Sequence, residues 1–440
     1  MDINQLYSIY LEHPEVCIDS RRVHAGCLFF ALKGSNFDGN KFAAAALSGG
    51  ATCAVVDDPS VVPAQGDHQY IVVDDSLLAL QQLAHLHRQR LGIPVLGITG
   101  TNGKTTTKEL VTAVLRMAYN VLATEGNLNN QIGVPLTLLR LKPEHQIAII
   151  EMGASHPNDI RELVEIACPN YGIITNVGKA HLEGFGSIEG VKKTKGELMD
   201  YLRQHNGIAF VHIDDPILVE LSHGLRIVSY GTSKSATFKG RIIHARPYTL
   251  SFRWRQVAIP HDISTRLVGD YNLPNALAAV AVGRFFDVAT AGILHALTEY
   301  QPQNNRSQLT PTEHNTLIVD AYNANPVSMA LAIRNITKIQ AKENKVLILG
   351  DMRELGKDGP REHVGVLKEI DPKLFDRIYL VGPLFGEAMS QSSEDLAQKG
   401  VCYKDVDCLI ADLRQKPIDG SLILIKGSNS IQLEKIVPLC

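Results

Sequence analysis

Several features that define other classes of protein are missing from this chain of 440 residues. Its seven cysteines form no Cys-x-x-Cys pair, which predicts reduced thiols in the cytoplasm and no disulfide framework. No apolar run approaches the roughly 18 residues of a membrane-spanning helix, and the amino terminus lacks the basic start of a secretion signal. Lys and Arg number 43 against 46 Asp and Glu, so the net charge of −3 excludes the basic excess of a nucleic-acid-binding protein. We predict a cytoplasmic protein with no membrane span and no nucleic-acid partner.

The chain does contain enough apolar material for several cores. Apolar residues make up 45% and charged residues 20%, as in an ordinary globular protein. At roughly 150 residues per domain, the length corresponds to about three domains. Changes in pattern along the sequence predict a small N-terminal α/β domain over 1–91, a central domain over 92–302 and a C-terminal domain over 303–440.

Strand-like apolar runs alternate with helical patterns in the second and third segments. The runs 94–99 and 147–150 each end in a polar or glycine turn, and the runs 316–319 and 346–349 do the same later in the chain. Such alternation predicts crossover connections and a mainly parallel sheet. The stretch 238–268 alternates residue by residue, which predicts an antiparallel portion. The expected fold class is α/β, with a central P-loop-type sheet and a Rossmann-like C-terminal domain.

A glycine-containing loop follows the first of these runs and precedes a helical pattern. Glycines let backbone N–H groups approach a phosphate, and the helix N-terminus adds positive potential. Lys104 would lie on the β and γ phosphates and Thr105 would bind Mg²⁺. Ile98 stands where the usual Walker A spacing has glycine, so a plain strand-to-helix turn is the alternative. The predicted nucleotide-binding residues are Gly100, Thr101, Asn102, Gly103, Lys104, Thr105 and Thr106.

Two further side chains, Glu151 and His181, are candidate metal ligands. Glu151 ends an apolar run, and an acid at the carboxyl end of a parallel strand can hold Mg²⁺ directly or through water. The alternative is an acid that begins a surface loop. His181 could offer an imidazole nitrogen, although a lone loop histidine is more often a solvated hydrogen-bonding group. Lys195 belongs to a charge run that usually marks a solvated helix face.

Amides and acids also gather at two other predicted turns. Asn127, Asn129 and Asn130 either satisfy their own backbone or recognise a polar ligand. Asp320 and Asp351 each end an apolar strand, so they could form a ligand rim at one edge of the third sheet. Taken alone, the turns that begin at Asp320 and Asp351 would be ordinary turns.

Taken together, these stretches resemble the ATP-dependent Mur ligase family of peptidoglycan synthesis over nearly the whole chain. Asp-Ser-Arg at 19–21 and Leu-Phe-Phe-Ala-Leu-Lys-Gly at 28–34 resemble its amino-terminal UDP-sugar domain. Thr-Asn-Gly-Lys-Thr-Thr resembles its ATP loop, which accounts for the departure from Walker spacing. Glu-Met-Gly at 151–153 and Ala-His-Leu-Glu-Gly-Phe-Gly at 180–186 are similar to its magnesium segments, and Lys195 stands where the family often has a carbamylated lysine.

The resemblance implies an ATP-dependent and Mg²⁺-dependent ligase, expected to be a monomer, with two small-molecule substrates. It would join D-alanyl-D-alanine to UDP-N-acetylmuramoyl (UDP-MurNAc) tripeptide through an acyl phosphate. The turn Tyr-Asn-Ala-Asn-Pro at 322–326 resembles the dipeptide-adding branch more than the branch that adds the third amino acid, or the folylpolyglutamate synthetases. Tyr271 and Asn429 depart from the usual histidine and arginine of the family.

The resemblance also implies roles for individual residues. The catalytic residues would be Lys104, Glu151, His181 and Lys195, and the magnesium ligands would be Thr105, Glu151, His181 and Lys195. The nucleotide would also contact Asn272, Asn275, Arg306, Asp320, Tyr322 and Asn323. The other substrates would contact Ser20, Arg21, Lys33, Gly34, Asn127, Asn129, Asn130, Asn325, Lys426 and Ser428.

Two other classes of function compete with a ligase. A P-loop ATPase or switch would hydrolyse ATP without an amine acceptor, but it leaves the segment 19–38 unexplained. A non-catalytic UDP-sugar-binding protein is disfavoured because the ATP and metal segments look intact.

Overall fold

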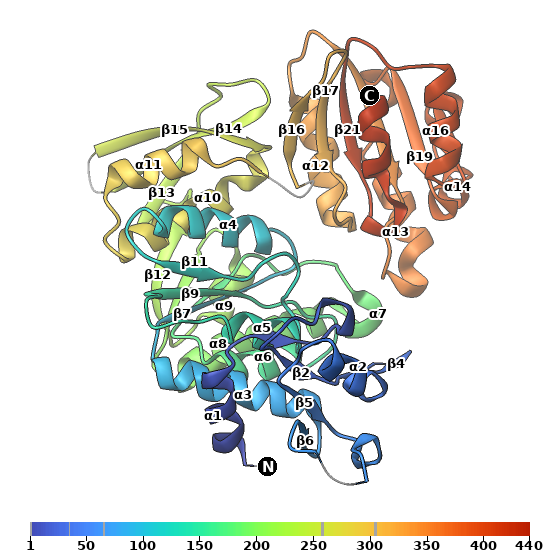
Figure 1. Ribbon diagram of the computed structural model, residues 1–440. Helices are drawn as coiled ribbons and strands as arrows, with labels where there is room; N and C mark the ends of the chain where they lie inside the picture. The colour runs from blue at the N-terminus through green and yellow to red at the C-terminus, as the bar shows by residue number, and fades with distance from the viewer. Residues whose placement is uncertain (1, 35, 65–66, 257–258, 303–305) are drawn as a thin grey trace.

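The computed structural model describes residues 2–34, 36–64, 67–256, 259–302 and 306–440. Their strands form one small sheet, two larger sheets and one two-stranded ribbon, and the three sheets follow one another from blue to red along the chain (Figure 1). Helices cover the sheets, so the predicted α/β class is confirmed. The domain boundaries at 91 and 302 stay predictions, and the predicted start of the third domain at 303 lies outside the described residues. Within the described part of the chain, no helix is both long enough and apolar enough to cross a membrane.

The first sheet is small and entirely parallel, in the order β1-β2-β5-β6. Helix α3 (Ser76–Leu91) begins where the side chain of Asp75 accepts a hydrogen bond from the backbone of Leu78, and it ends at Gly92, whose φ of 62° suits glycine. The remaining elements of this part are α1 (Ile3–Glu12), β1 (Val16–Cys17), β2 (Leu28–Phe30), β3 (Lys33–Gly34), β4 (Phe37–Asp38), α2 (Ala43–Ser48), β5 (Cys53–Val56) and β6 (Tyr70–Val72).

The second sheet is the largest, in the order β15-β14-β13-β12-β11-β10-β7-β9-β8. The strands from β8 to β13 pair in parallel, whereas β14 and β15 add an antiparallel portion, as predicted. The strands are β7 (Val95–Thr99), β8 (Val121–Ala123), β9 (Ile147–Glu151), β10 (Tyr171–Ile174), β11 (Ile208–His212), β12 (Arg226–Gly231), β13 (Phe238–Ile242), β14 (Thr249–Gln256) and β15 (Ile259–Val268). The helices are α4 (Lys104–Leu115), α5 (Gly133–Leu138), α6 (Asp159–Ala167), α7 (Leu182–Phe185), α8 (Ile188–Gln204), α9 (Pro216–Leu221), α10 (Leu273–Phe285) and α11 (Thr290–Glu299).

The order of this sheet reverses at β7. The chain runs from β7 to the far edge at β8, returns through β9, and then continues on the other side of β7 with β10. Every residue of β7 is buried, as expected for a central parallel strand. Ligands bind in the crevice at such a switch point, outside the carboxyl ends of the strands. The loop after β7 is therefore placed for ligand binding.

The third sheet has the order β16-β17-β21-β18-β19-β20, and only its edge strand β16 is antiparallel. This doubly wound arrangement agrees with the predicted Rossmann-like fold. Its elements are β16 (Gln308–Pro311), β17 (Thr316–Asp320), α12 (Pro326–Lys338), β18 (Asn344–Gly350), α13 (Gly359–Leu367), β19 (Arg377–Val381), α14 (Pro383–Met389), α15 (Glu394–Lys399), β20 (Gly400–Tyr403), α16 (Val406–Gln415) and β21 (Ser421–Lys426).

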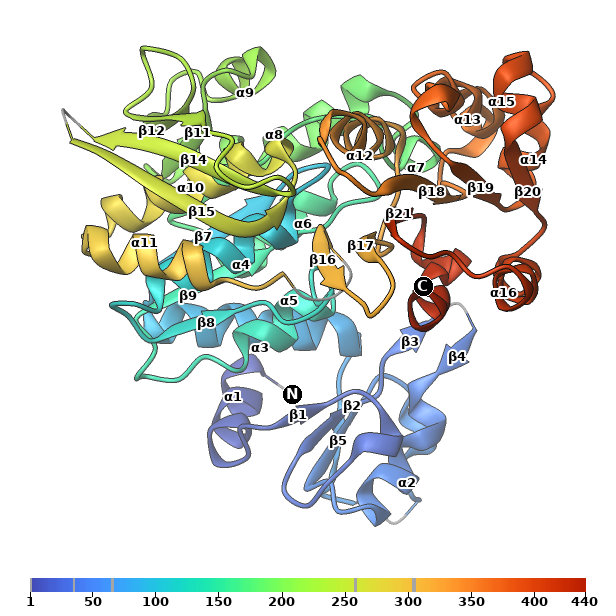
Figure 2. The ribbon, with the colours of Figure 1, turned by 90° about the horizontal axis from the view of Figure 1, so that it is seen from above.

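The N-terminal and central parts of the chain share a hydrophobic core, whereas the C-terminal part has cores that are largely its own. One core runs without a break from Leu6 and Leu83 of the N-terminal part to Leu163 and Leu198 under the second sheet. The opposite face of the second sheet is covered by α4, α10 and α11, which form a core with its strands. The third sheet has a separate core on each face, and Val268 is the buried residue of the second part that joins one of them. Figure 2 shows the C-terminal part beside the other two.

Candidate active site

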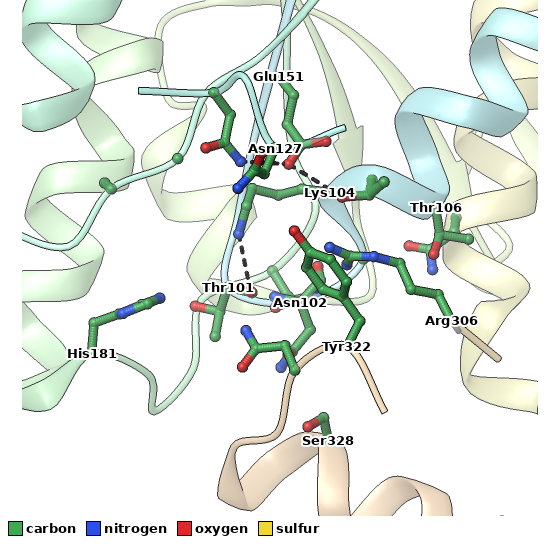
Figure 3. A pocket seen from close by; sticks show the side chains of 18 of the residues that line it. Thr101, Asn102, Lys104, Thr106, Asn127, Glu151, His181, Arg306, Tyr322 and Ser328 are labelled. Atoms are coloured by element: carbon green, nitrogen blue, oxygen red, sulfur yellow. Dashed lines mark hydrogen bonds between the residues drawn. The ribbon is translucent and has the colours of Figure 1, made fainter. Parts of the chain in front are cut away.

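A polar cavity of about 590 Å³ lies where the carboxyl ends of β7, β9 and β10 face the C-terminal part. Figure 3 shows side chains from both sides pointing into it. The predicted residues that line it are Thr101, Asn102, Gly103, Lys104, Thr105, Thr106, Asn127, Asn129, Asn130, Glu151, His181, Asn272, Asn275, Arg306, Asp320, Tyr322, Asn323 and Lys426. Stretches that lie far apart in the sequence therefore meet in one site.

The loop after β7 has the backbone geometry of a phosphate cradle. Gly100 has a φ of 147°, and a Cβ atom there would lie 1.9 Å from the hydroxyl oxygen of Thr175, so only glycine fits. Gly103, with a φ of 79°, precedes the first turn of α4. The ammonium group of Lys104 donates to the carbonyl oxygens of Gly100 at 2.7 Å and Thr101 at 3.2 Å, so it spans the open side of the loop. Burial lowers the pKa of Lys104.

Side chains that follow β10 hold this loop in place. Asn176 accepts a hydrogen bond from the backbone of Asn102 at 3.0 Å and donates one to its carbonyl oxygen at 2.9 Å. The hydroxyl of Thr175 donates to the same carbonyl oxygen at 2.6 Å. These contacts position the loop before any ligand binds, which reduces the ordering cost of binding.

Glu151 is the acid of the cavity, and its carboxylate is only half satisfied. Its Oε1 accepts from the hydroxyl of Thr105 at 3.2 Å and from the amide of Asn129 at 2.8 Å. Its Oε2 is buried and has no hydrogen-bond partner in the described part of the chain. An orphaned carboxylate oxygen beside a hydroxyl suits a divalent cation, which prefers oxygen ligands.

In the described part of the chain, no three His, Cys, Asp or Glu side chains gather as a potential metal site. Glu151 lies beside the hydroxyl of Thr105, and Mg²⁺ is normally bound through one or two carboxylates, water and substrate phosphates.

His181 lies just before α7, at a backbone φ of 50°. Its Nδ1 is 2.6 Å from Oε2 of Glu354, a residue of the C-terminal part that also lines the cavity. The hydrogen bond from His181 lowers the pKa of Glu354. The imidazole thus reaches the cavity while it contacts the opposite wall.

Lys195 is on α8 and only 2% exposed, so the predicted solvated face is wrong at this position. Its Nζ lies 5.9 Å from the ring centre of Phe185, and Lys195 does not line the cavity. Burial lowers the pKa of Lys195 well below its usual range, and the charge of Lys104 adds to that shift. Asp159 acts in the opposite direction.

The asparagine-rich turn lines the cavity and satisfies its own backbone, while its role in recognising a polar ligand stays a prediction. Asn129 contacts Glu151, as described above, and so belongs to the site. The side chain of Asn130 accepts hydrogen bonds from the backbone of Ile132 at 3.2 Å and Gly133 at 2.9 Å, so it also satisfies its own turn.

The C-terminal wall of the cavity is built from the ends of β17 and β21. Asp320 and Lys426 form an ion pair of 2.6 Å there. The guanidinium of Arg306 lies 3.9 Å from the ring centre of Tyr322 (Figure 3), a stacking contact that keeps both side chains at the cavity. Nε of Arg306 is buried and has no hydrogen-bond partner among the residues that the structure describes.

Asn272 and Asn275 contribute to the wall from the start of α10. The amide of Asn275 donates to Asn272 at 2.9 Å, and its oxygen accepts from Thr107 at 3.1 Å. Both are buried, so these contacts fix their side chains beside the phosphate loop.

Other predicted residues lie outside this cavity. Asn325 caps α12 and exchanges hydrogen bonds with Asn102, the shorter one 2.6 Å long. Ser428 accepts from the backbone of Arg353 at 3.0 Å. Gly100, Lys195 and the four residues of the N-terminal part complete the predicted set outside the cavity lining: Ser20, Arg21, Lys33 and Gly34.

The N-terminal residues have partners of their own. Arg21 is exposed and pairs with Asp19 at 2.8 Å. Lys33 pairs with Asp57 at 2.9 Å. Both cations are at the surface and can exchange these partners for an anionic ligand.

Several lining residues were not predicted as site residues, among them Gln131, Ser155, Asp159, Asn176 and Glu354. Asn176 follows β10, and the rule that identified Glu151 could have found it. No local signal marks Glu354, because its partner is in another part of the chain.

Comparison with known proteins places the whole chain in one family. Residues 14–88 match the Mur ligase family catalytic domain, residues 98–283 the Mur ligase middle domain and residues 305–429 the Mur ligase glutamate ligase domain. The UDP-N-acetylmuramoyl-tripeptide--D-alanyl-D-alanine ligase of Escherichia coli (strain K12) is 37% identical over 433 residues, covering 96% of this chain and 92% of the relative.

Two solved structures are similar over nearly their full length. MurF from Acinetobacter baumannii superposes with a TM-score of 0.86 at 30% identity, covering 96% of this chain and 92% of that one. MurF ligase from Thermotoga maritima, solved in complex with ADP, superposes with a TM-score of 0.85 at 25% identity, covering 98% and 97%.

Proposed function

This chain belongs to the Mur ligase family, and we propose that it joins D-alanyl-D-alanine to UDP-MurNAc-tripeptide at the expense of ATP. The product would be UDP-MurNAc-pentapeptide, with ADP and phosphate, in peptidoglycan synthesis. The observation that carries the proposal is the single cavity in which the phosphate loop, Glu151 and His181 meet the C-terminal residues Asp320 and Tyr322.

The reaction has two steps. The free carboxylate of the tripeptide attacks the γ-phosphate of ATP and gives an acyl phosphate and ADP. The amine of D-alanyl-D-alanine then attacks the acyl carbonyl, and the tetrahedral intermediate expels phosphate to leave an amide. Both reactants of the first step are anions, so the site must supply positive charge.

The chain supplies this charge at the N-terminus of α4. Lys104 would exchange its contacts with the loop carbonyls for the β and γ phosphates, and the loop N–H groups would hold the same oxygens. Asn272, Asn275 and Arg306 would border the rest of the nucleotide, because they line the same cavity.

Thr105 and Glu151 would hold Mg²⁺ against these phosphates, which fits the orphaned Oε2 of Glu151. When bound, Mg²⁺ neutralises phosphate charge and polarises the phosphoryl group. His181 and Lys195 would hold a second ion. For this role Lys195 would carry a carbamate, whose formation needs a neutral amine, and its lowered pKa supports this. A mass spectrum of the intact protein that shows only unmodified Lys195 would remove the carbamate from the proposal.

The remaining assignments follow from the position of each part. The N-terminal part, with Ser20, Arg21, Lys33 and Gly34, would bind the UDP-sugar. The C-terminal part would bind D-alanyl-D-alanine with Asn325, Lys426 and Ser428 and would close over the nucleotide to exclude water from the acyl phosphate. Scattering profiles that coincide with and without an ATP analogue and tripeptide substrate would contradict this closure. We also propose a cytoplasmic monomer, which light scattering of the purified protein can test.

The decisive experiment measures ADP release and ligated product by mass spectrometry, with and without D-alanyl-D-alanine. A ligase releases ADP together with pentapeptide product and depends on both substrates. ADP release without an acceptor would favour the ATPase reading, and binding of the UDP-sugar without ADP release would favour a binding protein. UDP-peptides with different third residues, in the same assay, would define the accepted tripeptide.

A further inference from the structure

Two side-chain contacts join the loop after β10 to the segment after β18. Lys179 contacts Glu362 at 2.8 Å, and His181 contacts Glu354 at 2.6 Å. Helix α7 of this loop lies beside the segment before α13 in both ribbon views (Figures 1 and 2). The C-terminal part therefore touches the loop that carries a predicted metal ligand.

Both members of the second pair have unusual backbone conformations. His181 has a φ of 50° and Glu354 a φ of 63°, in the left-handed region that non-glycine residues seldom adopt. Such conformations persist only where the surrounding structure imposes them, and they cluster at functional sites. Neither of the partners of the first pair, Lys179 and Glu362, has this conformation. Of these two pairs, the one that reaches the cavity is therefore the one with left-handed backbone conformations.

The contact occupies one ring nitrogen of His181 and leaves the other available. Nε2 has no hydrogen-bond or ion-pair partner among the described residues, and the imidazole points toward the cavity (Figure 3). A carboxylate on one ring nitrogen fixes both the orientation of the ring and the nitrogen that carries the proton. Glu354 also lines the cavity, and its side chain is 61% exposed, so the contact forms at the site itself.

We propose that Glu354 is a positioning residue that aims Nε2 of His181 into the active site from the opposite side of the cavity. The central part then lacks a correctly oriented His181 until the C-terminal part has docked. The inference deepens the proposed ligase function and rests on it. The contact between Lys179 and Glu362 has no such role, because neither residue lines the cavity.

The test compares Glu354→Ala and Glu354→Gln with Glu362→Gln in the full-length protein. Glu362→Gln is the matched control, because it weakens the neighbouring pair between the same two segments without touching His181. We expect Glu354→Ala to lower kcat for ligation by about 10-fold to 100-fold, the range typical for lost orienting partners of metal-binding histidines. The KM for ATP should change less than about threefold, since Lys104 and the loop are unaffected. Glu354→Gln keeps an acceptor oxygen and should recover part of the rate.

A second readout does not depend on catalysis. Nitrogen-15 NMR of histidine-labelled protein, with an ATP analogue bound and no divalent cation, reports which ring nitrogen of His181 carries the proton, with the signal assigned by its loss in His181→Gln. Wild type should show the proton on Nδ1, and Glu354→Ala should show a mixture of tautomers. The wild-type spectrum alone still tests the contact if Glu354→Ala does not fold.

Each outcome is decisive. Equal losses of kcat in Glu354→Ala and Glu362→Gln would mean that the contact between Glu354 and His181 only holds the C-terminal part against the central part, and this would overturn the proposal. An unchanged His181 signal in Glu354→Ala, or a wild-type proton on Nε2, would overturn it as well. A wild-type protein that fails to ligate would instead refute the function on which the proposal rests, which separates the two failures.

Discussion

Lys104 is the clearest point at which the proposed chemistry can be tested. Replacing it by alanine removes an ammonium group that lies 2.7 Å and 3.2 Å from two loop carbonyl oxygens, at the place where phosphate would bind. Two unit charges about 4 Å apart interact by about 4 kcal/mol at an effective dielectric constant of about 20. At about 1.4 kcal/mol per factor of ten, that corresponds to a loss of about 10³-fold in kcat/KM.

The fold should survive this change. Lys104→Ala removes two hydrogen bonds to the backbone, each of which contributes about 1 kcal/mol. Because the Lys104 side chain is partly buried with a lowered pKa, removing it also relieves a desolvation cost that opposes this loss. We expect the melting temperature to fall by only a few degrees for a cost of about 1 to 2 kcal/mol.

The assay is the rate of pentapeptide formation at several ATP concentrations, with melting curves for each variant. Lys193→Ala is the control, because Lys193 is an exposed lysine on α8 and should leave the rate unchanged. A Lys104→Ala protein that folds and retains more than about a tenth of wild-type kcat/KM would refute the assigned role, because the interaction would then contribute less than about 1.4 kcal/mol.

Three further changes test other parts of the structure. Gly100→Ala should weaken binding of a fluorescent ATP analogue at least tenfold, because its Cβ would lie 1.9 Å from Thr175; unchanged affinity would mean that the loop adapts. Asp320→Ala leaves Lys426, which is 1% exposed, with the carbonyl oxygen of Asn323 as an acceptor but without its ion-pair partner, and should lower stability by about 3 to 5 kcal/mol in chemical denaturation, whereas Asp320→Ala with Lys426→Met should recover most of it. Burial lowers the pKa of His363, so as pH falls the imidazole becomes protonated in the unfolded chain before it does in the folded protein. The contribution of neutral His363 to the free energy of unfolding is therefore full above about pH 6.5 and is lost as pH falls through the lowered pKa of the folded state. Melting curves of His363→Gln should show a weaker loss between pH 7.5 and 5.5 than wild type, and parallel curves would contradict this.

The parts of the site that follow a local rule could be predicted from sequence. Glu151 and Asp320 both end strands and line the cavity, as that pattern predicts. Asp351 follows β18 in the same pattern, but it is fully buried and accepts hydrogen bonds from the backbone at the start of α14, so its predicted place at a ligand rim is wrong. The glycines and Lys104 likewise form a local motif between a strand and a helix. In these cases the neighbours that determine the geometry are close in the sequence.

Contacts between distant segments could not be predicted in this way. Asn325, which caps α12, stays a predicted substrate contact, but its hydrogen bond to Asn102 of the loop after β7 joins distant segments and has no local signal. The burial of Lys195 depends on how α8 packs, and the charge pattern around it predicted a solvated face. Glu354 contacts His181 because the segment after β18 lies beside the segment after β10, and no periodic pattern in the sequence predicts that contact.

The uneven division of the apolar cores has a consequence for how such enzymes can be rebuilt or diversified. Leu6 and Leu83 belong to the same hydrophobic core as Leu163 and Leu198, so cutting the chain near residue 91 would expose apolar surface on both fragments. The C-terminal part has a core on each face of its sheet, and Val268 of the central part joins one of them. Recombination near residue 302 would therefore disturb fewer shared apolar contacts than recombination near residue 91, so we predict that the C-terminal part is the easier one to exchange.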